Sequence, residues 1–142
     1  MRKAYIAGPL RGDGTEHVIT QNRDRAASVA RELWRAGFSV FCPHLNTAGM
    51  VGLLDGCGKG EDAFIEGDIL WLQHADALFM LTDWERSEGA RREHAVALDC
   101  KIVIYYEHEI GEGHRAWRNN HRLYDIRDLY TLLGSPSEGL YT

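Results

Sequence analysis

Lys3-Ala4-Tyr5-Ile6-Ala7, followed at once by Gly8-Pro9, opens the chain with a short run of strand-forming character. Residues 16–36 follow with apolar side chains recurring at helical spacing, and Gly37 stands at their end. A strand followed by a helix that returns the chain for another strand is the building unit of a parallel sheet. This opening therefore indicates an α/β fold.

The alternation of strand and helix continues along the chain. Short β-rich runs predict strands at residues 3–7, 39–42, 77–81 and 101–105, and segments of helical period predict helices at residues 16–36, 62–74, 87–99 and 125–133. Residues 44–60, with five glycines, and the polar residues 107–122 show no clear period and are predicted as connections. Right-handed crossovers then give a doubly wound parallel sheet of four to five strands, Rossmann-like or flavodoxin-like, with helices on both faces. The ligand site is expected beyond the carboxyl ends of the strands, at Gly8, Pro43, Thr82 and Tyr106.

Length and composition limit the partners that we expect. The 142 residues are room for one domain, residues 1–142, and 16 Lys and Arg against 21 Asp and Glu give a formal net charge of −5. This balance argues against a nucleic-acid polymer as partner and still permits a small anionic ligand. Three irregularly spaced cysteines, Cys42, Cys57 and Cys100, are expected to be reduced thiols of a cytoplasmic protein. The longest apolar runs have five residues, and the basic start meets Gly8-Pro9 after four more, so we expect no membrane partner and no signal peptide.

Glu93 interrupts the apolar face of the helix predicted at residues 87–99. Positions 89, 93, 96, 97 and 100 share one face and read Gly, Glu, Val, Ala and Cys. A carboxylate on such a face loses hydration, which proteins avoid unless a partner or a function compensates, so Glu93 is a candidate catalytic residue. A helix rotated by one residue would instead make Glu93 a solvated partner of Arg92 or Lys101, and the pattern favours neither interpretation.

Asp68 flanks the apolar stripe of the helix predicted at residues 62–74, which consists of Ile65, Ile69 and Leu72. Two carboxylates at the edge of a sheet suit glycosidic chemistry, because one can attack or stabilise the sugar while the other handles a proton. Taken alone, the position of Asp68 is more typical of a solvated helix residue.

Residues 7–14, Ala-Gly-Pro-Leu-Arg-Gly-Asp-Gly, form a Gly-rich turn between the first strand and the first helix. Its N–H groups can approach an anion, the following helix N-terminus favours negative charge, and Arg11 adds a fork of donors. The turn has neither the G-x-G-x-x-G spacing of a dinucleotide site nor the G-K-[ST] of a P-loop. Its spacing alone favours an ordinary connection.

Several enzyme classes lack their motifs in this chain. There is no G-x-S-x-G elbow, no H-E-x-x-H pair and no H-x-E with P-C-x-x-C, so serine hydrolases, zincins and zinc deaminases lose their main support. His108, His114 and His121 fit no metal-ligand spacing and are predicted to form a solvated surface with neighbouring arginines. Three aromatic side chains are predicted to lie in the core: Trp34, Trp71 and Phe79.

Three segments match motifs of one known family. Residues 4–12, Ala-Tyr-Ile-Ala-Gly-Pro-Leu-Arg-Gly, look like its first strand and nucleotide loop. Residues 66–76, Glu-Gly-Asp-Ile-Leu-Trp-Leu-Gln-His-Ala-Asp, are similar to its helix with a catalytic aspartate. Residues 87–93, Ser-Glu-Gly-Ala-Arg-Arg-Glu, look like its small-residue turn before a nucleophilic glutamate. The chain thus resembles the nucleoside 2-deoxyribosyltransferase family, which includes relatives that hydrolyse nucleoside 5′-monophosphates.

The resemblance implies a role for three residues. Glu93 would be the nucleophile on C1′ of the sugar, Asp68 would manage the proton of the departing base, and Tyr5 would orient Glu93 with its phenol. The resemblance also implies a doubly wound fold, no metal or organic cofactor, and a homodimer or larger homo-oligomer whose neighbouring subunit completes the pocket. Substrate contacts are expected from Gly8, Pro9, Leu10, Arg11, Gly12, Ser87 and Gly89.

Ser87 departs from the transferase pattern and bears on the substrate. Six residues before the nucleophile, the nucleoside transferases tend to have an acidic residue for the sugar hydroxyl, whereas the monophosphate hydrolases tend to have serine, with an Arg-Gly pair like Arg11-Gly12. Serine at a helix N-terminus suits a phosphate, which an aspartate would repel. Residues 138–142 resemble the short C-terminal tail of some transferases, whereas residues 44–60, expected to contact the base, match no motif.

Together these features predict an enzyme that breaks the N-glycosidic bond of a 2′-deoxynucleoside or its 5′-monophosphate through a deoxyribosyl ester on Glu93, with a second base as acceptor. Whether water can replace that base depends on how well the closed pocket excludes solvent. The alternatives are a 5′-monophosphate N-glycosidase, a non-catalytic nucleotide-binding module, and an NAD glycohydrolase, for which the chain lacks a recognisable adenine site.

Overall fold

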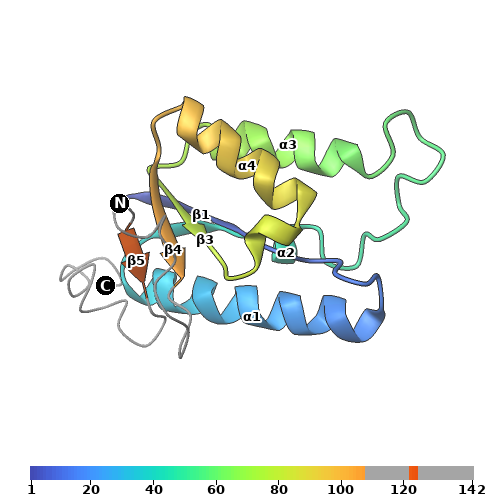
Figure 1. Cartoon of the computed structure of the whole chain (residues 1–142), viewed down its shortest axis with the longest axis horizontal. Helices are drawn as coiled ribbons and strands as arrows, with labels where there is room; N and C mark the ends of the chain where they lie inside the picture. Colours follow the sequence, from blue (N-terminus) through green and yellow to red (C-terminus); the bar gives the residue numbers. More distant parts are fainter. Residues whose placement is uncertain (108–121, 125–142) are drawn as a thin grey trace.

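The computed structural model describes residues 1–107 and 122–124. Five parallel strands form one sheet in the order β2-β1-β3-β4-β5: β1 (Lys3–Ala7), β2 (Ser39–Phe41), β3 (Ala77–Met80), β4 (Val103–Glu107) and β5 (Arg122–Tyr124). Helix α1 (Glu16–Arg35) covers one face of the sheet, and α3 (Asp62–Leu72) and α4 (Glu88–Asp99) cover the other (Figure 1). This is the doubly wound parallel sheet that the sequence predicts, and its strand order is flavodoxin-like.

The strand register brings the ends of three strands to the same edge of the sheet. Ala7 of β1 lies opposite Met80 of β3, and Met80 lies opposite Tyr106 of β4. The chain therefore leaves β1 at Gly8 and β3 at Leu81 side by side, next to Glu107 at the end of β4. A parallel sheet with a switch in strand order binds ligands at this edge.

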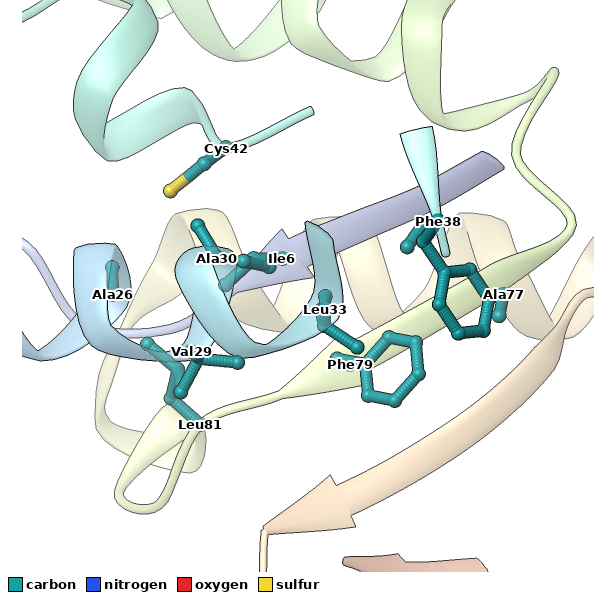
Figure 2. Packing of buried hydrophobic residues seen from close by; sticks show 11 residues of the cluster. Ile6, Ala26, Val29, Ala30, Leu33, Phe38, Cys42, Ala77, Phe79 and Leu81 are labelled. Atoms are coloured by element: carbon teal, nitrogen blue, oxygen red, sulfur yellow. The ribbon is translucent and has the colours of Figure 1, made fainter. Parts of the chain in front are cut away.

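The layer between α1 and the sheet is filled by small and branched side chains. Helix α1 begins after Thr15, whose side chain accepts a hydrogen bond from the Val18 N–H at 3.3 Å and satisfies one free donor of the first turn. Figure 2 shows the buried face of α1 packed on side chains of the sheet; the residues are Ala26, Val29, Ala30 and Leu33 on the helix and Ile6, Ala77, Phe79 and Leu81 on the sheet side. This layer fixes α1 over β1 and β3.

Gly8 allows the central strands to approach each other where they end. A Cβ atom on Gly8 would lie 2.6 Å from the Cβ of Leu81, closer than real side chains come. No larger residue fits there unless the ends of β1 and β3 move apart, so the glycine keeps the first loop close to the sheet.

The elements differ from the sequence prediction in several places. A short helix, α2 (Pro43–Asn46), extends into residues 44–60, which were predicted as a connection. Pro43 occupies its first turn, and β2 ends at Phe41, one residue earlier than predicted. A 3₁₀ turn, η1 (Trp84–Arg86), precedes α4, and β5 is a strand that the sequence analysis missed. The helix predicted at residues 125–133 and the predicted surface of His108, His114 and His121 lie outside the described residues.

The prediction of aromatic core residues was wrong for two tryptophans. Phe79 is fully buried, as predicted, but Trp34 is 43% exposed and Trp71 is 63% exposed. Both tryptophans belong to helices that cover the sheet, yet much of each side chain meets solvent. Trp71 stacks on Phe41 with ring centroids 5.4 Å apart. Within residues 1–107 and 122–124, no helix is both long and apolar enough to cross a membrane.

Candidate active site

A cavity of about 670 Å³ lies at the carboxyl edge of the sheet. The first loop, the start of α2, the segment before α3, and the facing ends of α3 and α4 contribute to its wall. Nine of the ten predicted site residues line it: Gly8, Pro9, Leu10, Arg11, Gly12, Asp68, Ser87, Gly89 and Glu93. The tenth, Tyr5, lies behind the wall and reaches the site through Glu93.

Glu93 is a buried carboxyl group in the cavity wall. It is only 4% exposed, on the face of α4 that also buries Ala90 and Ala97, so the interpretation of Glu93 as a solvated surface residue is wrong. The Tyr5 hydroxyl donates a hydrogen bond to Glu93 Oε2. Burial raises the pKa of Glu93 to about 8, nearby Asp68 adds to this rise, and the Tyr5 hydrogen bond opposes it by stabilising the carboxylate.

Tyr5 is placed to donate and not to accept. Its ring is fully buried on β1 and stacks on Phe41 with centroids 5.4 Å apart. Burial and the neighbouring Glu93 raise the pKa of the phenol far above its usual value, so the hydroxyl keeps its proton. A neutral phenol beside a carboxyl group can donate to the carboxylate form and thereby favour it.

Asp68 is the second buried carboxyl group of the cavity. It is 6% exposed on α3, so the solvated position that its sequence context favoured is also wrong. Among the described residues its carboxyl group has no hydrogen-bond partner, and burial raises its pKa to about 6. Asp68 and Glu93 are close enough for each proton state to affect the other. Two interacting carboxyl groups with raised pKa values are a usual property of an acid–base site.

The first loop is held by two side chains that sequence reasoning did not select. Asn22 of α1 donates from Nδ2 to the Leu10 carbonyl at 2.9 Å. His44 of α2 lies 3.0 Å through Nε2 from the Pro9 carbonyl, and its other ring nitrogen lies 3.9 Å from the Cys42 sulfur. Burial lowers the pKa of His44, so its ring is neutral and Nε2–H donates to the carbonyl. Both side chains fix the backbone that forms the cavity wall.

Arg11 lines the cavity but is already engaged. Its guanidinium forms an ion pair with Glu61, which lies directly before α3. The sequence predicted Arg11 as a free anion donor and contained no signal for this partner, since Glu61 is fifty positions away in a segment without period.

Ser87 and Gly89 form the start of α4 at the cavity. Ser87 caps the helix, because its hydroxyl oxygen accepts a hydrogen bond from the Ala90 N–H at 3.2 Å. A Cβ on Gly89 would lie 2.8 Å from Cδ1 of Ile65, so this glycine permits the close approach of α4 to α3 that brings Glu93 and Asp68 into one cavity. The described residues contain no group of three or more His, Cys, Asp or Glu side chains that could hold a metal ion.

Comparison with protein families gives one match, to residues 2–106 of this chain, and that family is described as a domain of unknown function, DUF4406. The chain belongs to the DUF4406 family. Every candidate site residue named above lies within the matched part of this DUF4406 chain. A comparison with curated proteins found no match.

Solved structures share the fold of this DUF4406 chain. One is a 2-deoxyribosyltransferase from the psychrotolerant bacterium Bacillus psychrosaccharolyticus, with a TM-score of 0.63 and 20% sequence identity over 94% of this chain and 97% of that chain. The doubly wound fold implied by the sequence resemblance is thus confirmed.

Proposed function

We propose that this DUF4406 chain cleaves the N-glycosidic bond of 2′-deoxynucleosides or their 5′-monophosphates through a covalent deoxyribosyl ester on Glu93, and transfers the sugar to an acceptor base. The observation that carries the proposal is the pair of buried carboxyl groups, Glu93 and Asp68, in one cavity with the Tyr5 hydroxyl on Glu93. The fold shared with a 2-deoxyribosyltransferase supports it.

The first half-reaction uses both carboxyl groups. The Glu93 carboxylate attacks C1′, and the C1′–N bond breaks with its electron pair going to the base. Asp68, in its acid form, gives the base a proton directly or through water. The products are the free base, the deoxyribosyl ester of Glu93 and the Asp68 carboxylate. Tyr5 donates to Glu93 and so keeps the carboxylate oriented while it is free.

The second half-reaction reverses these roles. The acceptor base attacks C1′ from the face that the first base left, the ester bond breaks, and Asp68 takes the proton that the acceptor loses. Two displacements at the same carbon give net retention of configuration. The Glu93 carboxylate and the Asp68 acid are then restored.

A single proton shared by the two carboxyl groups sets the active form. With pKa values of about 6 for Asp68 and about 8 for Glu93, the pair holds one proton between these pH values. Because the pKa of Glu93 is the higher of the two, the shared proton lies mostly on Glu93. Attack requires the minor form in which Asp68 carries this proton and Glu93 is ionised, and the Tyr5 hydrogen bond increases the share of that form. The proposal therefore expects a bell-shaped pH–rate profile with limbs near pH 6 and 8.

A 5′-monophosphate N-glycosidase with water as acceptor is the second candidate function. Ser87 at the first turn of α4 favours it, because a serine and free N–H groups at a helix N-terminus suit a phosphate. Arg86 beside it and Arg23 on α1 also line the cavity, and the buried Nε of Arg23 has no partner among the described residues.

Product analysis with and without a free acceptor base tests both functions. Deoxynucleosides and deoxynucleoside 5′-monophosphates are incubated with the protein, and the products are separated by chromatography. Exchange only with an acceptor supports the transferase, and base release without acceptor supports the hydrolase. Tight binding without turnover would leave a nucleotide-binding module, and nicotinamide release from NAD would point to the glycohydrolase.

Glu93→Gln tests the nucleophile. We expect the rate to fall by about 10³-fold or more, because an amide cannot form the ester. Glu66→Gln is the matched control: it makes the same change on an exposed residue of α3 and should retain full activity. If Glu93→Gln turned over substrate like the control, Glu93 would not be the nucleophile.

A further inference from the structure

Glu61 connects two segments that line the cavity. It stands directly before α3, yet its side chain makes no capping hydrogen bond with that helix. Instead, Oε1 accepts a hydrogen bond from the Gly52 N–H at 3.0 Å, and Oε2 forms the ion pair with Arg11. One carboxylate oxygen of Glu61 thus holds Arg11 in the cavity wall, and the other holds Gly52, which directly follows the wall residue Val51.

The Glu61 carboxylate pairs with the Arg11 guanidinium in the way that an anionic ligand would. The Arg11 side chain is 55% exposed and the Glu61 side chain 28%, so solvent screens their attraction. Such a partly exposed pair contributes about 0 to 1 kcal/mol. A phosphate monoester carries a charge of about −1.5 to −2 and three acceptor oxygens, and it is the stronger partner for a guanidinium fork.

The ion pair also separates the two substrate classes that the proposed function leaves open. The phosphate of a ligand can bind Arg11 only after the Arg11–Glu61 ion pair breaks. An unphosphorylated deoxynucleoside can bind without breaking this pair. The free energy of the Arg11–Glu61 pair is therefore subtracted from the binding of one class and not from the other.

We propose that Glu61 is an internal competitor for the anion that Arg11 binds, and that it sets the preference of the cavity between phosphorylated and unphosphorylated ligands. The identity of the ligand as a deoxynucleotide rests on the proposed function. The competition itself does not, because inorganic phosphate can report it.

Binding of inorganic phosphate to the whole chain, measured by titration calorimetry, tests the competition. Glu61→Gln removes the charge and keeps an amide oxygen that can accept from Gly52, so the wall is disturbed little. We expect this variant to bind phosphate about 2- to 5-fold more tightly than the unaltered protein, and Arg11→Met to bind it more weakly. Thermal unfolding of each variant verifies that it is folded.

Two further variants separate competition for Arg11 from a general loss of negative charge. Glu66→Gln is the matched control, since Glu66 pairs with exposed Lys59 at 2.7 Å and does not line the cavity. It should leave phosphate affinity unchanged. In the Arg11→Met background, Glu61→Gln should no longer improve binding. An unchanged affinity in Glu61→Gln, or an equal gain without Arg11, would overturn the proposal.

A deoxynucleoside and its 5′-monophosphate extend the test to the substrate. Glu61→Gln should tighten binding of the monophosphate alone, so the ratio of the two dissociation constants should shift about 2- to 5-fold. If Glu61→Gln tightens phosphate binding but the protein cleaves neither compound, the proposed function is refuted and the role of Glu61 as a competitor stands. If the protein cleaves either compound but Glu61→Gln does not change phosphate binding, the role of Glu61 is refuted and the proposed function stands.

Discussion

The hydroxyl group of Tyr5 acts directly on the protonation of Glu93. This hydroxyl lowers the pKa of Glu93 against the opposing effects of burial and of Asp68. Removing that hydroxyl leaves a buried carboxylate without its donor, so the shared proton moves toward Glu93. The fraction of protein with Glu93 ionised and Asp68 protonated must then fall at every pH.

Tyr5→Phe should lower the maximal rate by about 10- to 100-fold, which corresponds to about 1.4 to 2.8 kcal/mol. Without the Tyr5 hydroxyl, the pKa of Glu93 should rise, so the midpoint of the falling limb near pH 8 should move to higher pH. The limb near pH 6 is set by Asp68 and should stay in place. The pH–rate profile measures both. Tyr105→Phe, on a ring that stacks on Phe79, is the control with an unchanged profile. A uniform loss of rate without movement of the upper limb would contradict the proposed role.

The sequence indicated the first loop, the start of α4 and the two carboxyl groups as parts of the site, and all of these line the cavity. Glu93 breaks an apolar helical face, and this is a signal in the residues themselves. The pattern could not decide its burial, because a rotation of the helix by one residue exposes it. Glu61 and His44 gave no signal, since their contacts join segments without period.

At the scale of the elements, periodicity located most helices and strands, and packing decided the rest. Helix α1 and strand β3 were predicted within one residue at either end. β5 could not be predicted, because three residues outside an apolar run gain strand geometry only by pairing with β4. Trp71 shows the same limit for burial: its spacing fits the apolar stripe of α3, but only the position of Phe41 decides which side of the ring is covered.

The approach of α3 to α4 can be tested at its closest point. Gly89→Ala gains helix propensity, but its methyl group meets Ile65 at the cavity wall, so Ile65 must shift toward the ligand space or push α3 away. We expect stability to change by less than about 1 kcal/mol and kcat/KM to fall about 10-fold. Gly67→Ala on α3 is the control: nothing lies within 4 Å of its Cβ, so it should raise stability by about 0.5 to 1 kcal/mol and keep activity. Equal activities in the two variants would show that helix approach does not control the site.

At the scale of the whole molecule, burial of Glu93 and Asp68 lowers the stability of the fold, while the proposed function requires both. The Arg25–Glu107 ion pair ties α1 to the end of β4, and Glu107 also accepts from the Thr82 N–H at 3.0 Å, so the edge that holds the cavity is well supported. Such support can compensate for burying Glu93 and Asp68, which costs free energy whenever either is ionised. The predicted homo-oligomer, cytoplasmic location and single-domain organisation stay predictions.

The cost of burying Glu93 gives a prediction for the pH dependence of folding. In the folded chain its pKa is raised from the usual 4.5 to about 8, so between these values the folded state binds more protons than the unfolded state, and stability falls as pH rises. Glu93→Gln removes this penalty. At about 1.4 kcal/mol per pKa unit, the free energy of unfolding of the variant should exceed that of the unaltered protein by at most about 5 kcal/mol above pH 8. Near pH 5 the two free energies should differ little. Urea unfolding at pH 5, 7 and 9 measures the difference, to which Asp68 contributes little because it is present in both proteins. A difference that stayed constant across this range would mean that Glu93 does not change its proton affinity on folding, and the single shared proton of the proposed mechanism would then lose its basis.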